Sequence, residues 1–147
     1  MMNNVGASDL GLNLKPMNEK SLFEWFLAAY LFGKPIQQSV ARRTWDVFMD
    51  YGLTSPRKIV AKTWQQLVDI LGEGHYRRYD EATARNLLAV SRTLIDNHEG
   101  QISNLLETSS NRQDLAKQLE TLQGVGPKTT EIFLSQLPAG YLQKTAG

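Results

Sequence analysis

Apolar residues recur along most of this chain at the three- and four-residue spacing of amphipathic helices. In the first such segment, Ser21 and Glu24 have the spacing of a helix-starting capping box, and Gly33 and Pro35 provide an end. No segment alternates apolar and polar residues with the period of two that marks a strand, so we expect an all-α fold. The expected helices cover residues 21–32, 37–51, 56–60, 64–71, 80–98, 102–107, 112–122 and 129–137.

The same pattern divides the 147 residues into three parts. Residues 1–18 are rich in Asn, Gly and Ser and show no period, which predicts a flexible N-terminal arm. Residues 19–137 form one helical domain, long enough to bury a single core. Residues 138–147 are unpatterned and are expected to form a C-terminal tail.

The composition excludes several kinds of site. The chain has no cysteine, which rules out disulfides, thiolate zinc sites and cysteine-ligated iron–sulfur clusters. Its two histidines are far apart and lie near no carboxylate cluster, which argues against a catalytic metal. There is neither an apolar run of the ~18 residues that span a bilayer nor a signal-peptide pattern. We therefore expect a cytoplasmic protein with no membrane partner.

The net charge says little about function, because sixteen Lys and Arg residues are balanced by fifteen Asp and Glu residues, which gives a net charge of +1. A protein that depends on bulk attraction to phosphates is usually more basic. Residues 34–62 carry six cations against two aspartates, which indicates either a basic patch or, more simply, a solvated helix face. Trp25, Trp45 and Trp64 lie on or beside apolar stripes and are interpreted as core.

The most specific pattern lies between residues 115 and 134. Two short helical segments are joined by the turn Gly124-Val125-Gly126-Pro127. Glycine permits positive φ and close approach to a ligand, and proline suits the first turn of a helix. The free amides of Gly126, Lys128 and Thr129 would then face a ligand at the helix start, which suits a phosphate. An ordinary corner between two helices is the alternative interpretation.

The whole string L-x-x-L-x-G-V-G-P-K-T, residues 119–129, is similar to the helix–hairpin–helix motif of DNA repair proteins. From Phe23 to about Leu134 the chain resembles the endonuclease III superfamily of DNA glycosylases, which act in base excision repair. Residues 26–41 correspond to the first two helices of that family's barrel. The resemblance implies a six-helix barrel that grips the phosphate backbone of duplex DNA without reading its sequence. The implied DNA-binding residues of the hairpin are Gly124, Val125, Gly126, Lys128 and Thr129.

The resemblance also implies a catalytic position. In bifunctional members, a lysine at the place of Lys128 attacks the sugar and forms a Schiff base. The family requires an aspartate about eighteen residues later, where this chain has Ala146, and no Asp or Glu follows Glu131. A phosphate contact is therefore the simpler role for Lys128.

Two loops of the family contact DNA beside the hairpin. The position of the glutamine that fills the gap left by a flipped base holds Lys34, although Gln37 or Gln38 would serve with a shifted loop. His75 and Tyr76 fall in the loop that presents a wedge residue to the duplex, where an aromatic ring can stack on a base. An ordinary surface loop is an equal alternative.

The family's hairpins also bind a monovalent cation through backbone carbonyl oxygens. The corresponding residues here are Glu120, Leu122 and Val125. Because main-chain oxygens make this bond, their side chains neither favour nor oppose it.

The family's cysteine cluster loop and second lobe have no counterpart in this sequence. We therefore expect either a shortened form of a longer protein or a minimal relative that binds DNA without cutting it. Three functions remain open. The first is a DNA-binding domain without full catalysis, the second an active glycosylase and AP lyase that uses Lys128, and the third a protein-interaction module.

Overall fold

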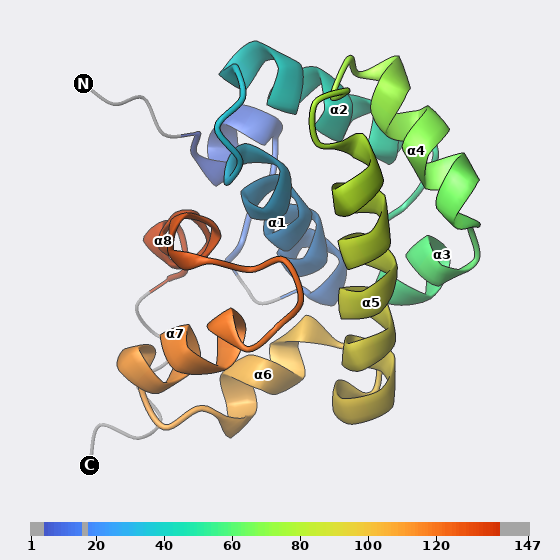
Figure 1. Ribbon diagram of the computed structural model, residues 1–147. Coiled ribbons are helices and arrows are strands. Elements are labelled where there is room, and N and C mark those ends of the chain that lie inside the picture. Colours follow the sequence, from blue (N-terminus) through green and yellow to red (C-terminus); the bar gives the residue numbers. More distant parts are fainter. Residues whose placement is uncertain (1–4, 16–17, 139–147) are drawn as a thin grey trace.

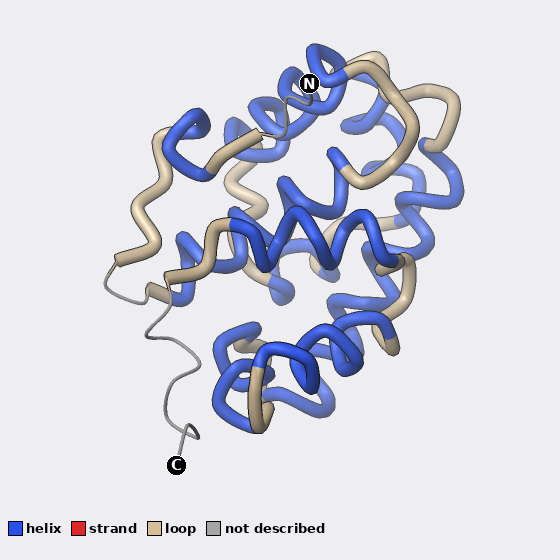
Figure 2. Tube along the Cα trace, turned by 90° about the vertical axis from the view of Figure 1, so that its left-hand side faces the viewer, coloured by secondary structure: helices blue, strands red, loops and turns tan. Residues whose placement is uncertain are grey.

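The computed structural model describes residues 5–15 and 18–138, and within them the chain forms eight α-helices, a short 3-10 helix and no strand (Figures 1 and 2). The expected all-α class is thus confirmed. The elements are η1 (Ala7–Leu10), α1 (Glu19–Phe32), α2 (Gln38–Asp50), α3 (Pro56–Val60), α4 (Trp64–Glu73), α5 (Asp80–His98), α6 (Ile102–Thr108), α7 (Arg112–Glu120) and α8 (Pro127–Ser135).

Helix α1 is the central element, and it packs against α2, α6 and α8 (Figure 1). Its residues 22–31 are all buried, whereas the sequence pattern predicted burial of one broad face. A helix that is apolar on most sides is stable only when other helices surround it. The indole Nε1 of Trp25 donates a hydrogen bond to the Phe133 carbonyl oxygen in α8 at 2.9 Å, which ties α1 to the last helix.

The start of α1 differs from the expected capping box. Asn18 is the N-cap, and its side-chain oxygen accepts a hydrogen bond from the Ser21 amide at 3.0 Å. The helix therefore begins two residues before the expected start. Glu24 makes an ion pair with Lys20 at 2.8 Å instead of bonding to the helix start.

Two tryptophans are confirmed as core, and the third is not. Trp25 and Trp45 are buried, with the indole of Trp45 donating to the Glu24 carbonyl oxygen at 2.9 Å. Trp64 is 38% exposed, because it occupies the first position of α4 and its indole donates outward to the Glu81 carbonyl oxygen at 3.2 Å.

The segment before α1 is more ordered than the loose arm that we expected. Ala7, Leu10 and Leu14 are buried against the core, and the Ala7 amide donates a hydrogen bond to the Gln136 side chain at 3.0 Å. These three apolar side chains follow helical spacing, a signal that the Asn- and Gly-rich composition obscured. The predicted tail lies almost wholly outside the described residues. Among the residues that the structure describes, no helix is both long and apolar enough to cross a membrane.

Candidate nucleic-acid interface

The predicted hairpin is present as two helices, α7 and α8, joined by residues 121–126. Gly126 is the N-cap of α8, with an extended backbone at φ −111° and ψ −169°, and Pro127 occupies the first helical position as expected. Inside the turn, the Val125 amide donates to the Leu122 carbonyl oxygen at 3.1 Å. Gly124 has φ +78°, a conformation that glycine adopts without strain.

At the start of α8, the first amides find no hydrogen-bond acceptor among the residues that the structure describes. The Gly126 N-cap has no side chain that could accept a hydrogen bond, unlike Asn18 of α1, Ser55 of α3 and Thr63 of α4. Within the described part of the chain, the amides of Gly126, Lys128 and Thr129 donate to no acceptor. A helix start carries partial positive charge and unsatisfied donors, so this end of α8 can bind an anion.

The side chains around this helix start leave it open to a ligand. Apart from Gly126 and its two chain neighbours, no described residue has an atom within 4 Å of the position that a Cβ on Gly126 would take. Pro127 and Lys128 are exposed, and the Lys128 ammonium makes no ion pair with any described residue. Thr129 and Val125 are buried, so only their main-chain groups remain for binding.

Hydrogen bonds from α1 and α5 hold the turn, and neither was predicted from the sequence. The Tyr30 hydroxyl of α1 donates a hydrogen bond to the Gln123 carbonyl oxygen at 2.5 Å. The Thr93 hydroxyl of α5 donates a hydrogen bond to the Gln123 side-chain oxygen at 3.1 Å. Burial raises the pKa of Tyr30 well above its ordinary value, so the phenol stays protonated and remains a donor. In the sequence, Tyr30 was only one member of an apolar stripe.

The loop after α1 lies against the same end of α8. A Cβ on Gly33 would overlap the Thr129 hydroxyl, so glycine allows this close approach. Lys34 follows in the loop and is half-buried, while Gln37 is exposed and forms the N-cap of α2 without a side-chain hydrogen bond. The structure therefore places the beginning of the loop that carries Lys34 beside the first turn of α8.

The loop between α4 and α5 differs from expectation. Tyr76 is fully buried, and its hydroxyl donates to the Leu31 carbonyl oxygen at 2.6 Å, so its ring is not presented for stacking on a base. Its burial raises the pKa of the Tyr76 phenol. The backbone bends inward here because the Tyr76 amide bonds to the Leu71 carbonyl oxygen at 3.0 Å. Of the two residues predicted to contact DNA from this loop, His75 is exposed, with φ +68°.

The three carbonyl oxygens that the resemblance assigns to a monovalent cation differ in their hydrogen bonding. The Leu122 oxygen already accepts the Val125 amide, whereas the Glu120 and Val125 oxygens accept no hydrogen bond from a described residue. The described residues contain no cluster of three or more His, Asp or Glu side chains that could hold a metal ion.

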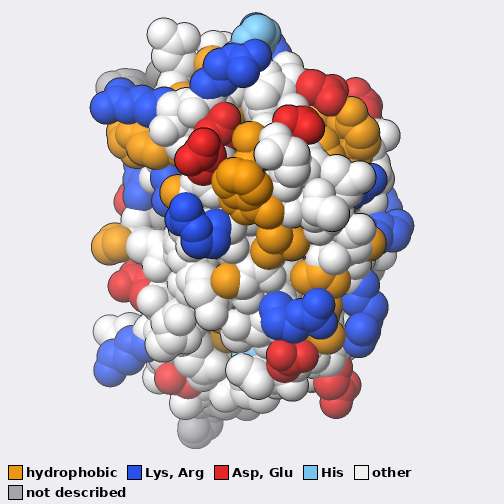
Figure 3. Space-filling model, turned by 45° about the vertical axis from the view of Figure 1, so that its right-hand side comes forward, with side chains coloured by type: hydrophobic (Ala, Val, Ile, Leu, Met, Phe, Trp, Pro, Cys, Tyr) orange, Lys and Arg blue, Asp and Glu red, His pale blue; other side chains and the backbone are white. Residues whose placement is uncertain are grey.

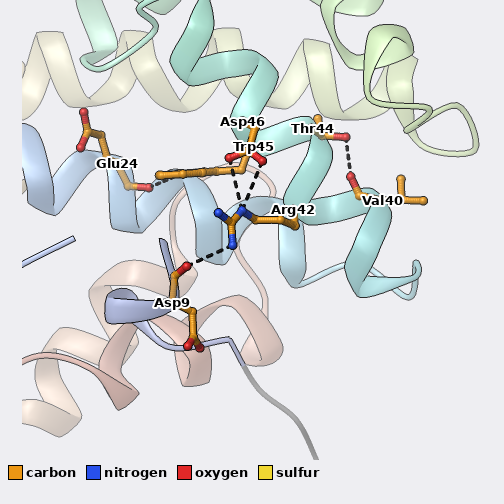
Figure 4. Close-up of polar contacts among 7 residues, drawn as sticks. All are labelled: Asp9, Glu24, Val40, Arg42, Thr44, Trp45 and Asp46. Atoms are coloured by element: carbon orange, nitrogen blue, oxygen red, sulfur yellow. Dashed lines mark hydrogen bonds and ion pairs between the residues drawn. The ribbon is translucent and has the colours of Figure 1, made fainter. Parts of the chain in front are cut away.

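Two of the basic residues between 34 and 62 have partners within the protein. Arg42 of α2 pairs with Asp46 at 3.2 Å and donates to the Asp9 carbonyl oxygen at 3.0 Å (Figure 4). Lys62, between α3 and α4, lies 5.8 Å from the Tyr51 ring centre. On the face shown in Figure 3, basic and acidic side chains are intermixed. On this face, charge density therefore does not mark a DNA-binding surface.

Comparison with protein-family models, with curated proteins and with solved structures gave no match to this chain.

Proposed function

We propose that this chain is a DNA-binding domain that holds the phosphate backbone of duplex DNA at the start of α8. The observation that supports this most directly is the open helix start, where the amides of Gly126, Lys128 and Thr129 donate to no described residue and Lys128 is exposed. The resemblance of residues 119–129 to helix–hairpin–helix motifs points to the same ligand. The domain would be related to the endonuclease III-type glycosylases, with their six-helix barrel.

A phosphate fits this helix start because its oxygens accept hydrogen bonds from main-chain amides while the helix dipole favours its negative charge. Lys128 would add a charge-assisted contact to the same phosphate or to its neighbour. Contacts of this kind position a protein on the duplex but carry no sequence information. The proposed binding is therefore independent of sequence, and Lys34 would meet the same strand from the adjacent loop.

We assign Lys128 to phosphate binding and not to nucleophilic attack. Its ammonium pairs with no described carboxylate, and Glu131 lies one turn further along the same helix, so it does not face Lys128 across a cleft. Borohydride trapping on DNA with an abasic site separates the two roles. We expect no covalent adduct, whereas an adduct that disappears in Lys128→Ala would establish lyase chemistry.

The direct test of DNA binding is Gly126→Val, measured by fluorescence anisotropy with a labelled duplex at low salt. A side chain at this position meets open space in the protein, but it would stand where the phosphate must approach. We expect the affinity to fall about tenfold. Loss of the glycine N-cap would cost at most about 1 kcal/mol of stability.

Thr63→Ala is the matched control, because it removes the N-cap of α4 at a similar cost in stability and should leave DNA affinity unchanged. Gly124→Val would be a poor test, since its Cβ would overlap Tyr30 and disrupt the turn. Undiminished affinity in Gly126→Val would refute the proposed site. Absence of any DNA binding by the unaltered chain at low salt would favour a protein-interaction module.

A further inference from the structure

We infer that Tyr30 is a positioning residue for the hairpin, which fixes the turn of residues 122–126 in the conformation that leaves the first amides of α8 free. This inference rests on the proposed function of the hairpin, although its structural part can be tested separately. The Tyr30 hydroxyl bonds to Gln123 and not to the Gly126, Lys128 or Thr129 amides, so it would act only through the turn.

Burial and aromatic contacts hold the Tyr30 side chain in place. It is fully buried in α1, and its ring meets the Phe26 ring edge-on with centres 5.8 Å apart. Phe26 in turn meets Phe133 of α8 at 5.7 Å, also edge-on. The tyrosine therefore belongs to a row of aromatic rings that joins α1 to α8, and its hydroxyl has little freedom to move.

The turn is shaped to receive this hydroxyl. The Tyr30 hydroxyl donates the 2.5 Å hydrogen bond to the Gln123 carbonyl oxygen. The same hydroxyl fills the space that a side chain at residue 124 would occupy. Together with φ +78°, this makes glycine the residue that fits at 124. The hydrogen bond that the Thr93 hydroxyl of α5 donates to the Gln123 side-chain oxygen restrains the same residue. Residue 123 is thus fixed through both its backbone and its side chain.

Fixing residue 123 matters because only three residues separate it from the start of α8. A turn that samples other conformations presents the α8 amides to a phosphate for only part of the time. The apparent affinity then falls by the fraction of molecules in the competent conformation. Removing the Tyr30 hydroxyl should therefore weaken DNA binding without removing any group that touches DNA.

The test compares Tyr30→Phe with Tyr76→Phe. Both residues are buried tyrosines whose hydroxyls donate to a backbone carbonyl oxygen, at 2.5 Å and 2.6 Å, but only Tyr30 bonds to the hairpin turn. We expect Tyr30→Phe to bind a labelled duplex about fivefold more weakly than Tyr76→Phe, as for the loss of one hydrogen bond. Equal DNA affinity of the two variants would contradict the positioning role in binding.

Amide hydrogen exchange supplies a readout that general destabilisation would not reproduce. In Tyr30→Phe the Val125 amide, which closes the turn, should exchange faster while amides in the middle of α5 keep their protection. Uniformly faster exchange, or no change at Val125, would refute the inference. Should Tyr30→Phe fail to fold, Thr93→Val removes the second restraint on Gln123 and must show the same local effect.

Failure of this inference is distinguishable from failure of the proposed function. If Gly126→Val binds DNA normally, the proposed function fails, while selective exchange at Val125 in Tyr30→Phe would still support positioning of the turn. If Gly126→Val loses affinity but Tyr30→Phe behaves like Tyr76→Phe, the proposed function stands and the role of Tyr30 is refuted.

Discussion

Helices α6 and α8 both begin without a side-chain cap from their own N-cap residues, Gln101 and Gly126, yet their first amides have different partners. At α6, the Glu19 carboxylate accepts hydrogen bonds from the amides of Ile102 and Ser103, at 2.7 Å and 3.1 Å. At α8, no described residue supplies an equivalent group. The protein thus provides its own anion at the start of α6, and no described residue provides one at the start of α8.

The two helix starts differ in how much their first amides contribute to stability. Hydrogen bonds from helix-start amides to a carboxylate are charge-assisted, and the helix dipole strengthens them. Glu19 lies on α1, so the same bonds also fasten α6 to the central helix (Figure 1). The open start of α8 forgoes this stabilisation. Under the proposed function, a bound phosphate would restore it.

The largest expected effect comes from removing the anion of α6. We expect Glu19→Ala to lower the free energy of unfolding by about 2 kcal/mol, because two charge-assisted hydrogen bonds are lost together. Urea denaturation measures this change. DNA affinity should stay unaltered, since the Glu19 carboxylate bonds to α6 and not to the described residues of the hairpin.

Glu107→Ala is the matched control for Glu19→Ala. It removes an exposed carboxylate of α6 that makes no hydrogen bond or ion pair with a described residue. Its expected effect on stability is within about 0.5 kcal/mol. If both variants lost the same small amount, the contrast between the two helix starts would have no energetic basis.

A smaller effect is expected from the charge beside α8. Lys128→Gln should weaken DNA binding severalfold and reduce the slope of log affinity against log salt by about one, the amount for one phosphate contact. Titration of a labelled duplex at several salt concentrations gives both quantities. Lys117→Gln, an exposed lysine on α7, should leave the slope unchanged. A slope that Lys128→Gln does not alter would place the phosphate elsewhere.

Local signals in the sequence predicted much of this fold. Apolar spacing predicted the long α5 over residues 80–98, and the glycines and Pro127 predicted the turn before α8. These features depend on neighbouring residues, so a single sequence contains them. The open N-cap at Gly126 was also foreseeable, because glycine has no side chain to accept a hydrogen bond.

The features that the sequence did not reveal are long-range contacts. Glu19 and Ile102 are 83 residues apart, and Tyr30 and Gln123 are 93 apart, so no local pattern relates them. The burial of Tyr76 was missed for a similar reason, since its partner is the Leu31 carbonyl oxygen. Both the anion of α6 and the anchor of the hairpin depend on how α1 packs.

The most direct test is Gly126→Asp, which would give α8 the internal carboxylate that α6 has. The extended backbone of Gly126 suits an aspartate N-cap, and its Cβ position is open. We expect the free energy of unfolding to rise by about 0.5 kcal/mol while affinity for duplex DNA falls at least about tenfold. Damage to the fold would lower both quantities, so the opposite signs identify competition for one site. DNA affinity equal to that of the unaltered chain would contradict the account.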